Sequence, residues 1–122
     1  MKRFNNIIGT YGEEISQDLL IKRGHVILEK NFKCKLGEID IISSINNANC
    51  ICFIEVKSRF NTSYGMPLEA VTYSKIKKIR KAAEYYINKN KLFEYEFRFD
   101  VIEVFLDRKS DDFSINVIEN AF

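Results

Sequence analysis

Two apolar runs separated by a cluster of asparagines constrain this chain more than any other feature. Residues 38–44 (EIDIISS) begin with alternating polar and apolar side chains, and residues 50–57 (CICFIEVK) form an apolar run of strand length. The intervening residues 46–49 (NNAN) are typical of a turn. Consecutive strands joined by a short turn pair as a hairpin by default. We therefore expect an antiparallel hairpin over residues 38–57.

The position of the turn sets the register of this hairpin. If the turn is centred between Asn47 and Ala48, Asp40 lies opposite Glu55, and Glu38 lies opposite Lys57. One face is then expected to carry Glu38, Asp40, Ile42, Phe53, Glu55 and Lys57, and the other face is expected to be core, with Ile39, Ile41, Cys52, Ile54 and Val56. A β-bulge in either strand would shift this register by one residue.

Two opposed carboxylates on one hairpin face need a compensating positive charge. Directly opposed Cβ atoms lie about 5 Å apart, and two negative charges at such a distance repel by roughly 3 kcal/mol at an effective dielectric of about 20. Mg²⁺ would offset this repulsion, because it binds carboxylates together with waters and substrate phosphate. Asp40, Glu55 and Lys57 therefore indicate a metal-dependent phosphodiesterase site, with Lys57 orienting a water or stabilising charge on the phosphate. The alternative is a plain Glu38–Lys57 ion pair on a half-exposed strand.

The rest of the chain supplies two helices and three more strands. Residues 8–22 have helical periodicity, and their second stripe of small residues would let the helix lie close to a sheet. Ser74 can cap a second helix, which carries Ile76, Ile79 and Ala83 on one face. Strands are expected over 25–35, 97–106 and 114–118, with a loop over 61–67. The order α-β-β-β-α-β-β predicts a mixed α/β fold, a sheet flanked by helices.

Composition and charge limit the class of protein. A chain of 122 residues with 46% hydrophobic and 30% charged residues is expected to form one globular domain. No apolar run approaches the roughly 20 residues of a membrane span. The three cysteines come without a secretion signal, so we expect a cytoplasmic protein rather than a disulfide framework. Residues 72–91 hold seven basic residues and one acidic residue, which favours either a phosphate-binding face or a solvated face.

A longer string of residues carries a family resemblance. It comprises Gly12-Glu13, Gly24, Asn31, Gly37-Glu38-Ile39-Asp40, Glu55-Val56-Lys57-Ser58-Arg59, Gly65-Met66-Pro67, Glu69-Ala70-Val71, Lys75, Arg98-Phe99-Asp100-Val101 and Asn120-Ala121-Phe122. Together these residues resemble the bacterial YraN-like family. Asp40 followed by Glu55-Val56-Lys57 also resembles the signature of PD-(D/E)xK nucleases. The YraN-like family is similar in turn to archaeal Holliday junction resolvases.

The resemblance implies a single restriction-endonuclease-like domain over residues 1–122 and a DNA endonuclease activity that depends on Mg²⁺ or Mn²⁺. It implies that Asp40, Glu55 and the Val56 carbonyl bind the metal, and that Lys57 is the catalytic lysine. Glu13 matches an acidic residue that resolvase-like nucleases add to the metal site. Helical periodicity alone leaves the choice between Glu13 and Glu14 open, and a first-turn acid favoured by the helix dipole is the structural alternative.

Further basic residues are candidates for contacts with nucleic acid. They are Arg59, Lys75, Lys78, Arg80 and Lys81, of which Lys75 lies at a helix start, where phosphate binds favourably. Asp100 is expected to be a structural partner of Arg98 or Arg59. The expected substrates are branched or damaged DNA structures in repair or recombination, and a homodimer is an expected form because resolvases act in pairs. The alternative is a non-catalytic nucleic-acid-binding or adaptor module on a nuclease scaffold.

Overall fold

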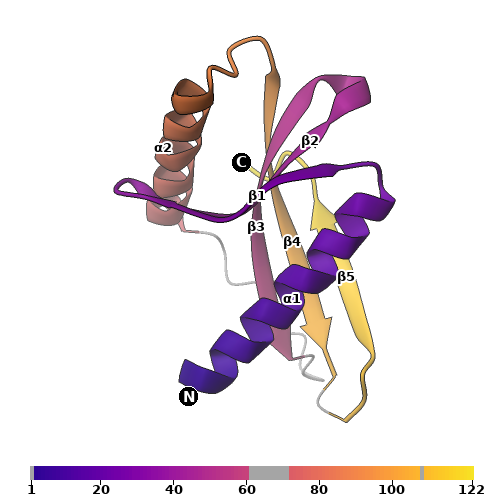
Figure 1. The fold of residues 1–122 in the computed structure, drawn as a ribbon. Helices are drawn as coiled ribbons and strands as arrows, with labels where there is room; N and C mark the ends of the chain where they lie inside the picture. The colour runs from indigo at the N-terminus through magenta and orange to yellow at the C-terminus, as the bar shows by residue number, and fades with distance from the viewer. Residues whose placement is uncertain (1, 61–71, 108) are drawn as a thin grey trace.

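The protein is a mixed sheet of five strands with one helix packed on each face (Figure 1). The structure, a computed structural model, describes residues 2–60, 72–107 and 109–122. The elements are α1 (Lys2–Lys22), β1 (Val26–Cys34), β2 (Gly37–Ile45), the 3₁₀ turn η1 (Asn46–Ala48), β3 (Cys50–Phe60), α2 (Tyr73–Asn90), β4 (Glu96–Leu106) and β5 (Phe113–Ile118). This order confirms the α-β-β-β-α-β-β prediction. The loop predicted over 61–67 lies outside the described residues.

The strands lie in the sheet in chain order, β1-β2-β3-β4-β5. The β1–β2, β2–β3 and β4–β5 pairs are antiparallel, whereas β3 and β4 are parallel. A parallel pair needs a crossover connection, and α2 is the helix of that connection. The start of α2 therefore lies near the second half of β3, which contains Lys57.

Helix α1 begins at Lys2 rather than at Ile8 and approaches β3 closely through small residues. A Cβ at Gly12 would overlap the Ser58 hydroxyl of β3, so only glycine permits this approach. Ser16 is fully buried, and its hydroxyl donates to the Gly12 carbonyl at 2.8 Å. The predicted close contact of the small stripe with the sheet is therefore confirmed, and it fixes the position of Glu13 relative to β3.

The sheet separates two hydrophobic clusters. The cluster under α1 contains Ile15 and Leu20 of the helix with Ile41, Ile54 and Val104 of the strands. The cluster under α2 consists of Phe32, Ile39, Ile42, Ile51, Phe53, Ile79, Ala82, Ala83 and Tyr86.

The second cluster corrects one prediction. Ile39 was expected on the same face as Ile41, but it packs under α2 with Ile42. The alternation of β2 therefore breaks at Asp40. The break coincides with Asn31 on β1, which lies between the Lys30↔Ile41 and Phe32↔Ile39 pairs and has a left-handed φ of 51°.

Helix α2 begins two residues earlier than predicted, because its cap is Thr72 rather than Ser74. The Thr72 hydroxyl accepts a hydrogen bond from the Lys75 backbone N–H at 3.2 Å. This bond satisfies one of the free N–H groups of the first turn. It also anchors the backbone of Lys75 at the mouth of the candidate site.

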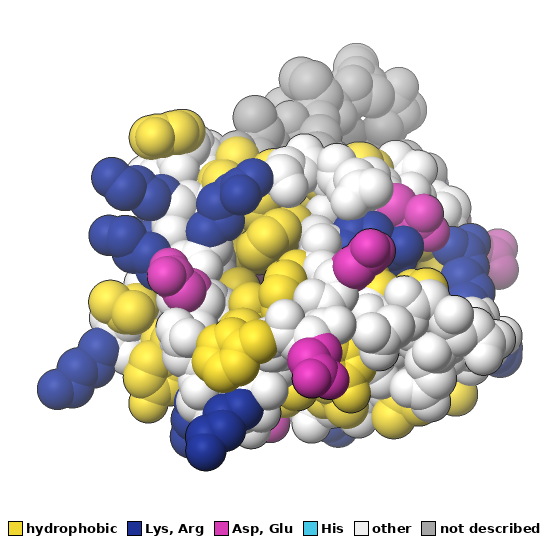
Figure 2. Space-filling view, turned by 90° about the horizontal axis from the view of Figure 1, so that it is seen from above, with side chains coloured by type: hydrophobic (Ala, Val, Ile, Leu, Met, Phe, Trp, Pro, Cys, Tyr) yellow, Lys and Arg dark blue, Asp and Glu magenta, His cyan; other side chains and the backbone are white. Residues whose placement is uncertain are grey.

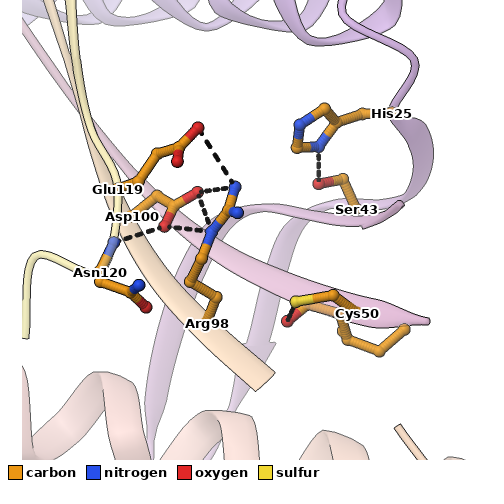
Figure 3. Close-up of polar contacts among 8 residues, drawn as sticks. His25, Ser43, Cys50, Arg98, Asp100, Glu119 and Asn120 are labelled. Atoms are coloured by element: carbon orange, nitrogen blue, oxygen red, sulfur yellow. Dashed lines mark hydrogen bonds and ion pairs between the residues drawn. The ribbon is translucent and has the colours of Figure 1, made fainter. Parts of the chain in front are cut away.

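A buried polar cluster ties the C-terminus to β4 (Figure 3). Arg98 donates to both carboxylate oxygens of Asp100 at 2.9–3.1 Å, and Asp100 also accepts from the Asn120 backbone N–H at 3.1 Å. Asp100 is only 2% exposed, so this pair is a structural element of the fold. The predicted pairing of Asp100 with Arg98 is confirmed.

His25 and the cysteines are buried or half-buried residues of the fold. His25 is buried, and its Nδ1 lies 2.8 Å from the Ser43 hydroxyl. Burial and the charge of Arg98 lower the pKa of His25. All three cysteines are free thiols, as expected without a disulfide framework. Neither of the two described α-helices combines the length and the apolar character that a membrane-spanning helix requires.

Candidate active site

The candidate site lies where β2 and β3 stop pairing. The antiparallel ladder has the predicted register from Ile45↔Cys50 to Ile41↔Ile54 and ends there. Beyond it, the Asp40 carboxylate accepts a hydrogen bond from the Val56 backbone N–H at 2.7 Å. The predicted Glu38–Lys57 pairing is wrong, because the β2–β3 ladder ends at Ile41↔Ile54, and Glu38 pairs only on the other side of β2, with Lys33 of β1. At this point a hydrogen bond to the Asp40 side chain therefore takes the place of backbone pairing between β2 and β3.

Asp40 and Glu55 lie close together, as the hairpin predicted. Glu55 is only 7% exposed. Burial raises the pKa of Asp40 to about 7, and the negative charge of Glu55 and a hydrogen bond with the Glu55 carboxyl act in the same direction. The Val56 N–H lowers it by less. The fold therefore holds two carboxyl groups so close together that the ionised form of Asp40 is disfavoured.

Helix α1 adds Glu13 rather than Glu14 to this pair. Glu13 is half-buried, and Glu14 is exposed. Burial raises the pKa of Glu13, a hydrogen bond with Asn31 opposes this, and the charges of Glu55 and Glu38 raise the pKa further. Of the two residues that helical periodicity left open, Glu13, beside Gly12, is therefore the more buried one and the one whose pKa responds to Glu55.

Two lysines counter the acidic pair. The Lys75 Nζ lies 2.8 Å from Glu55 Oε1, and the Lys57 Nζ lies 3.7 Å from the same oxygen. Burial alone would lower the pKa of Lys75, but hydrogen bonds with Glu55 and Lys57 and the charges of Glu55 and Asp40 together outweigh burial and raise it. The shorter contact comes from Lys75, although Lys57 was the lysine expected beside the acids. Glu55 is therefore held by cations from both β3 and α2.

A cleft of about 630 Å³ opens onto these groups from the α2 side of the sheet. Its lining includes Asp40, Glu55, Lys75 and Lys78, with the β1–β2 turn at its other wall. A smaller cavity of about 120 Å³ lies on the α1 side, and its lining includes Glu13, Asn31 and Asp40, with Glu14 at its exposed margin. Asp40 thus borders both cavities, which is consistent with the break in alternation at this residue.

The predicted nucleic-acid contacts divide into those near the cleft and those away from it. Lys75 and Lys78 line the cleft. Arg80 instead lies over the rings of Phe99 and Phe122, with its Cζ 5.2 and 5.9 Å from their centroids. Lys81 is exposed further along α2, and Arg59 lies beside Phe105 of β4. Figure 2 shows basic side chains gathered on the side where α2 and the β1–β2 turn lie in Figure 1.

The donor set of the site fits a hard divalent cation. Asp40 and Glu55 supply carboxylate oxygens, which Mg²⁺ and Mn²⁺ prefer, and Mg²⁺ commonly binds through one or two carboxylates and completes its shell with water. Among the described residues, no three His, Cys, Asp or Glu side chains are grouped closely enough to hold a metal ion by themselves. The residues therefore fit a two-carboxylate site, and ligation by Glu13 and the Val56 carbonyl stays a prediction.

Two residues of the site were not assigned a role from the sequence. Asn31 is a hydrogen-bond partner of Glu13. Its signals in the sequence were its place among the residues of the family resemblance and an asparagine inside a strand, a residue type that tolerates the left-handed region. Gly37 lets the β1–β2 turn pack on α2, since a Cβ there would lie 2.7 Å from the Lys78 carbonyl oxygen. Both residues shape the walls around the acids and carry no chemistry of their own.

The acidic pair predicts how the stability of the metal-free protein depends on pH. A carboxyl whose folded pKa is raised keeps its proton to a higher pH when folded than when unfolded, so stability falls as the pH rises through this interval. For Asp40 the interval runs from its ordinary value of 3.8 to about 7. We expect the free energy of unfolding to fall by roughly 2 kcal/mol between about pH 5 and pH 8, allowing for partial solvent screening.

Urea denaturation in the presence of a chelator measures this change. Asp40→Asn should remove most of the decline, whereas Glu14→Gln, at an exposed position on α1, should leave it in place. An equal decline in the wild type and in Asp40→Asn would assign the pH dependence to other groups.

Comparison with known proteins places the chain in a family. Residues 12–104 match the model of "Uncharacterised protein family UPF0102". A UPF0102 protein of Clostridium novyi is 59% identical over 122 residues, which cover 100% of both chains. UPF0102 proteins of Clostridium acetobutylicum and Clostridium perfringens are each 49% identical over 122 residues, which cover 100% of this chain and 98% of theirs. The chain therefore belongs to the UPF0102 family, which confirms the YraN-like resemblance of its motifs.

Proposed function

We propose that this protein is a divalent-metal-dependent nuclease that hydrolyses phosphodiester bonds in DNA. The observation that carries the proposal is the Asp40–Glu55 pair, two mutually repelling carboxyl groups beside a cleft with a basic margin. A carboxylate pair of this kind is costly to the metal-free fold. Such a cost is typical of sites that are built for a cation or for proton transfer.

The residues have distinct parts in this proposal. Asp40 and Glu55 would hold Mg²⁺ or Mn²⁺, which when bound polarises a phosphoryl oxygen and lowers the pKa of water. Lys57, on the same strand as Glu55, would donate to the phosphate and stabilise the negative charge that develops on it. The Val56 N–H fixes the Asp40 carboxylate at 2.7 Å and so orients this acid before any ligand arrives.

The cleft supports nucleic acid as the substrate. Lys78 is exposed and lines the cleft, and the first turn of α2 presents backbone N–H groups at its edge. Lysine side chains and helix N-termini both bind phosphate without reading bases. This fits a substrate recognised by its backbone or shape, as a branched DNA would be.

A non-catalytic binding module is the second candidate. The observation that favours it is that Glu55 already has two ammonium groups within 3.7 Å, so the site is partly neutralised without metal. Such a module would bind DNA in a salt-dependent manner without a need for divalent cations.

The test is cleavage of labelled junction, flap and single-stranded DNA by the purified protein with Mg²⁺, with Mn²⁺ and with chelator. We expect product only with the cations. Salt-sensitive retention of DNA without product on any substrate would overturn the nuclease proposal in favour of the binding module. Product that persists in chelator would overturn the metal dependence.

A further inference from the structure

Lys75 lies closer to Glu55 than Lys57 does, and the proposed function does not use it. Its Nζ lies 2.8 Å from Glu55 Oε1, against 3.7 Å for Lys57. The Glu55 side chain is 8% exposed, whereas that of Lys75 is 43% exposed. The carboxylate is therefore fixed inside the site, and the ammonium reaches it from the solvent side.

The backbone of Lys75 is placed by the start of α2. Thr72 caps the helix through the Lys75 N–H, which puts this lysine in the first turn. The first turn contains no acidic residue. A helix N-terminus disfavours a nearby cation, because it carries a partial positive charge. The position of the Lys75 ammonium therefore depends on the negative charge of Glu55 and Asp40, and it is not favoured by the helix itself.

The ammonium compensates the charge that a divalent cation would also compensate. Both would use Glu55 oxygens, and both are drawn by the charge of Asp40, which raises the pKa of Lys75 together with Glu55. An ammonium on a flexible stem of four carbons can leave a partly exposed position without disturbing the backbone. Lys57 lies on the same strand as Glu55 and is less exposed, at 20%.

We infer that Lys75 is a resident counter-cation that competes with the divalent metal for Glu55 and must leave this carboxylate when the metal binds. The inference rests on the proposed metal site and adds a regulator of its occupancy. Lys75 weakens metal binding to the empty site, and in return it keeps the metal-free acids together.

Calorimetric titration of the metal-free protein with Mn²⁺ tests the inference without any nucleic acid present. We expect Lys75→Met to bind Mn²⁺ about tenfold more tightly than the wild type, which corresponds to about 1.4 kcal/mol. Lys75→Arg keeps the charge and should bind like the wild type. Circular dichroism and urea denaturation of each variant confirm that it folds.

Lys78→Met is the matched control, because Lys78 lies one turn further along α2, lines the same cleft and is more exposed. If Lys78→Met gained as much Mn²⁺ affinity as Lys75→Met, the gain would come from the loss of any nearby positive charge, and the inference would be overturned. Unchanged or weaker Mn²⁺ binding by Lys75→Met would also overturn it, as would the absence of Mn²⁺ binding in both proteins.

The outcome is separable from that of the nuclease proposal. Tighter Mn²⁺ binding by Lys75→Met in a protein that cuts no DNA would support the counter-cation and reject the nuclease. Metal-dependent cleavage by a protein whose Lys75→Met variant binds Mn²⁺ unchanged would reject the counter-cation alone.

Discussion

Replacing Asp40 with asparagine is expected to lower metal-dependent DNA cleavage by on the order of 10³-fold, the scale seen when an electrostatic group of an active site is removed. The variant keeps the size of the side chain and an oxygen that can accept from the Val56 N–H. It removes the charge that would hold the metal. Glu55→Gln and Lys57→Met should each have effects of similar size, and initial rates of cleavage under saturating Mn²⁺ measure all three.

The acids near the site supply matched controls for this prediction. Glu13→Gln should lower the rate by a smaller factor, roughly 10- to 100-fold, as expected for a supporting or additional ligand. Glu14→Gln, at the next position of α1 but exposed, should cut at the wild-type rate. DNA retention in chelator should be largely kept by all of these variants. Cleavage that survives in Asp40→Asn, Glu55→Gln and Lys57→Met alike would place the chemistry elsewhere or assign it to a contaminant.

The acidic pair was predictable because the turn and the strand pattern are local features. The asparagine-rich turn and the apolar run after it fixed which residues face each other, and the register predicted for Ile42 and Phe53 is the one observed. The small stripe of α1 likewise predicted a close approach to the sheet. In both cases, one short segment contains all the information that the inference needs.

The break at Asp40 was not predictable in this way. It depends on a neighbouring strand, where Asn31 adopts a left-handed conformation, and on the replacement of a ladder hydrogen bond by the Asp40 side chain. The contact of Lys75 with Glu55 depends on the crossover that returns the chain over the sheet. Sequence patterns report the period within a segment, but they do not report where separate segments meet.

The second large effect is expected from Asp100→Ala, which should lower the free energy of unfolding by about 3 kcal/mol. The carboxylate is 2% exposed and accepts from Arg98 at 2.9–3.1 Å and from the Asn120 N–H at 3.1 Å. Its loss leaves a guanidinium with 18% side-chain exposure without its main partner, and it leaves a backbone N–H unsatisfied. Urea denaturation followed by circular dichroism measures the change.

Arg98 contacts both acids in Figure 3, but it donates hydrogen bonds to Asp100 and only forms a longer ion pair with Glu119, so the effect should belong to the Arg98–Asp100 pair. Glu119 is 3.8 Å from Arg98 and its side chain is 59% exposed, so Glu119→Gln should cost less than about 1 kcal/mol. The double change Arg98→Met with Asp100→Leu should recover part of the lost stability, because an apolar pair leaves no buried charge unpaired. A cost below about 1 kcal/mol for Asp100→Ala would contradict the assigned structural role. The Mn²⁺ affinity of Asp100→Ala tests whether Asp100 has a structural role or binds metal. We expect the affinity to stay at the wild-type value, whereas a large loss would make Asp100 part of the metal site.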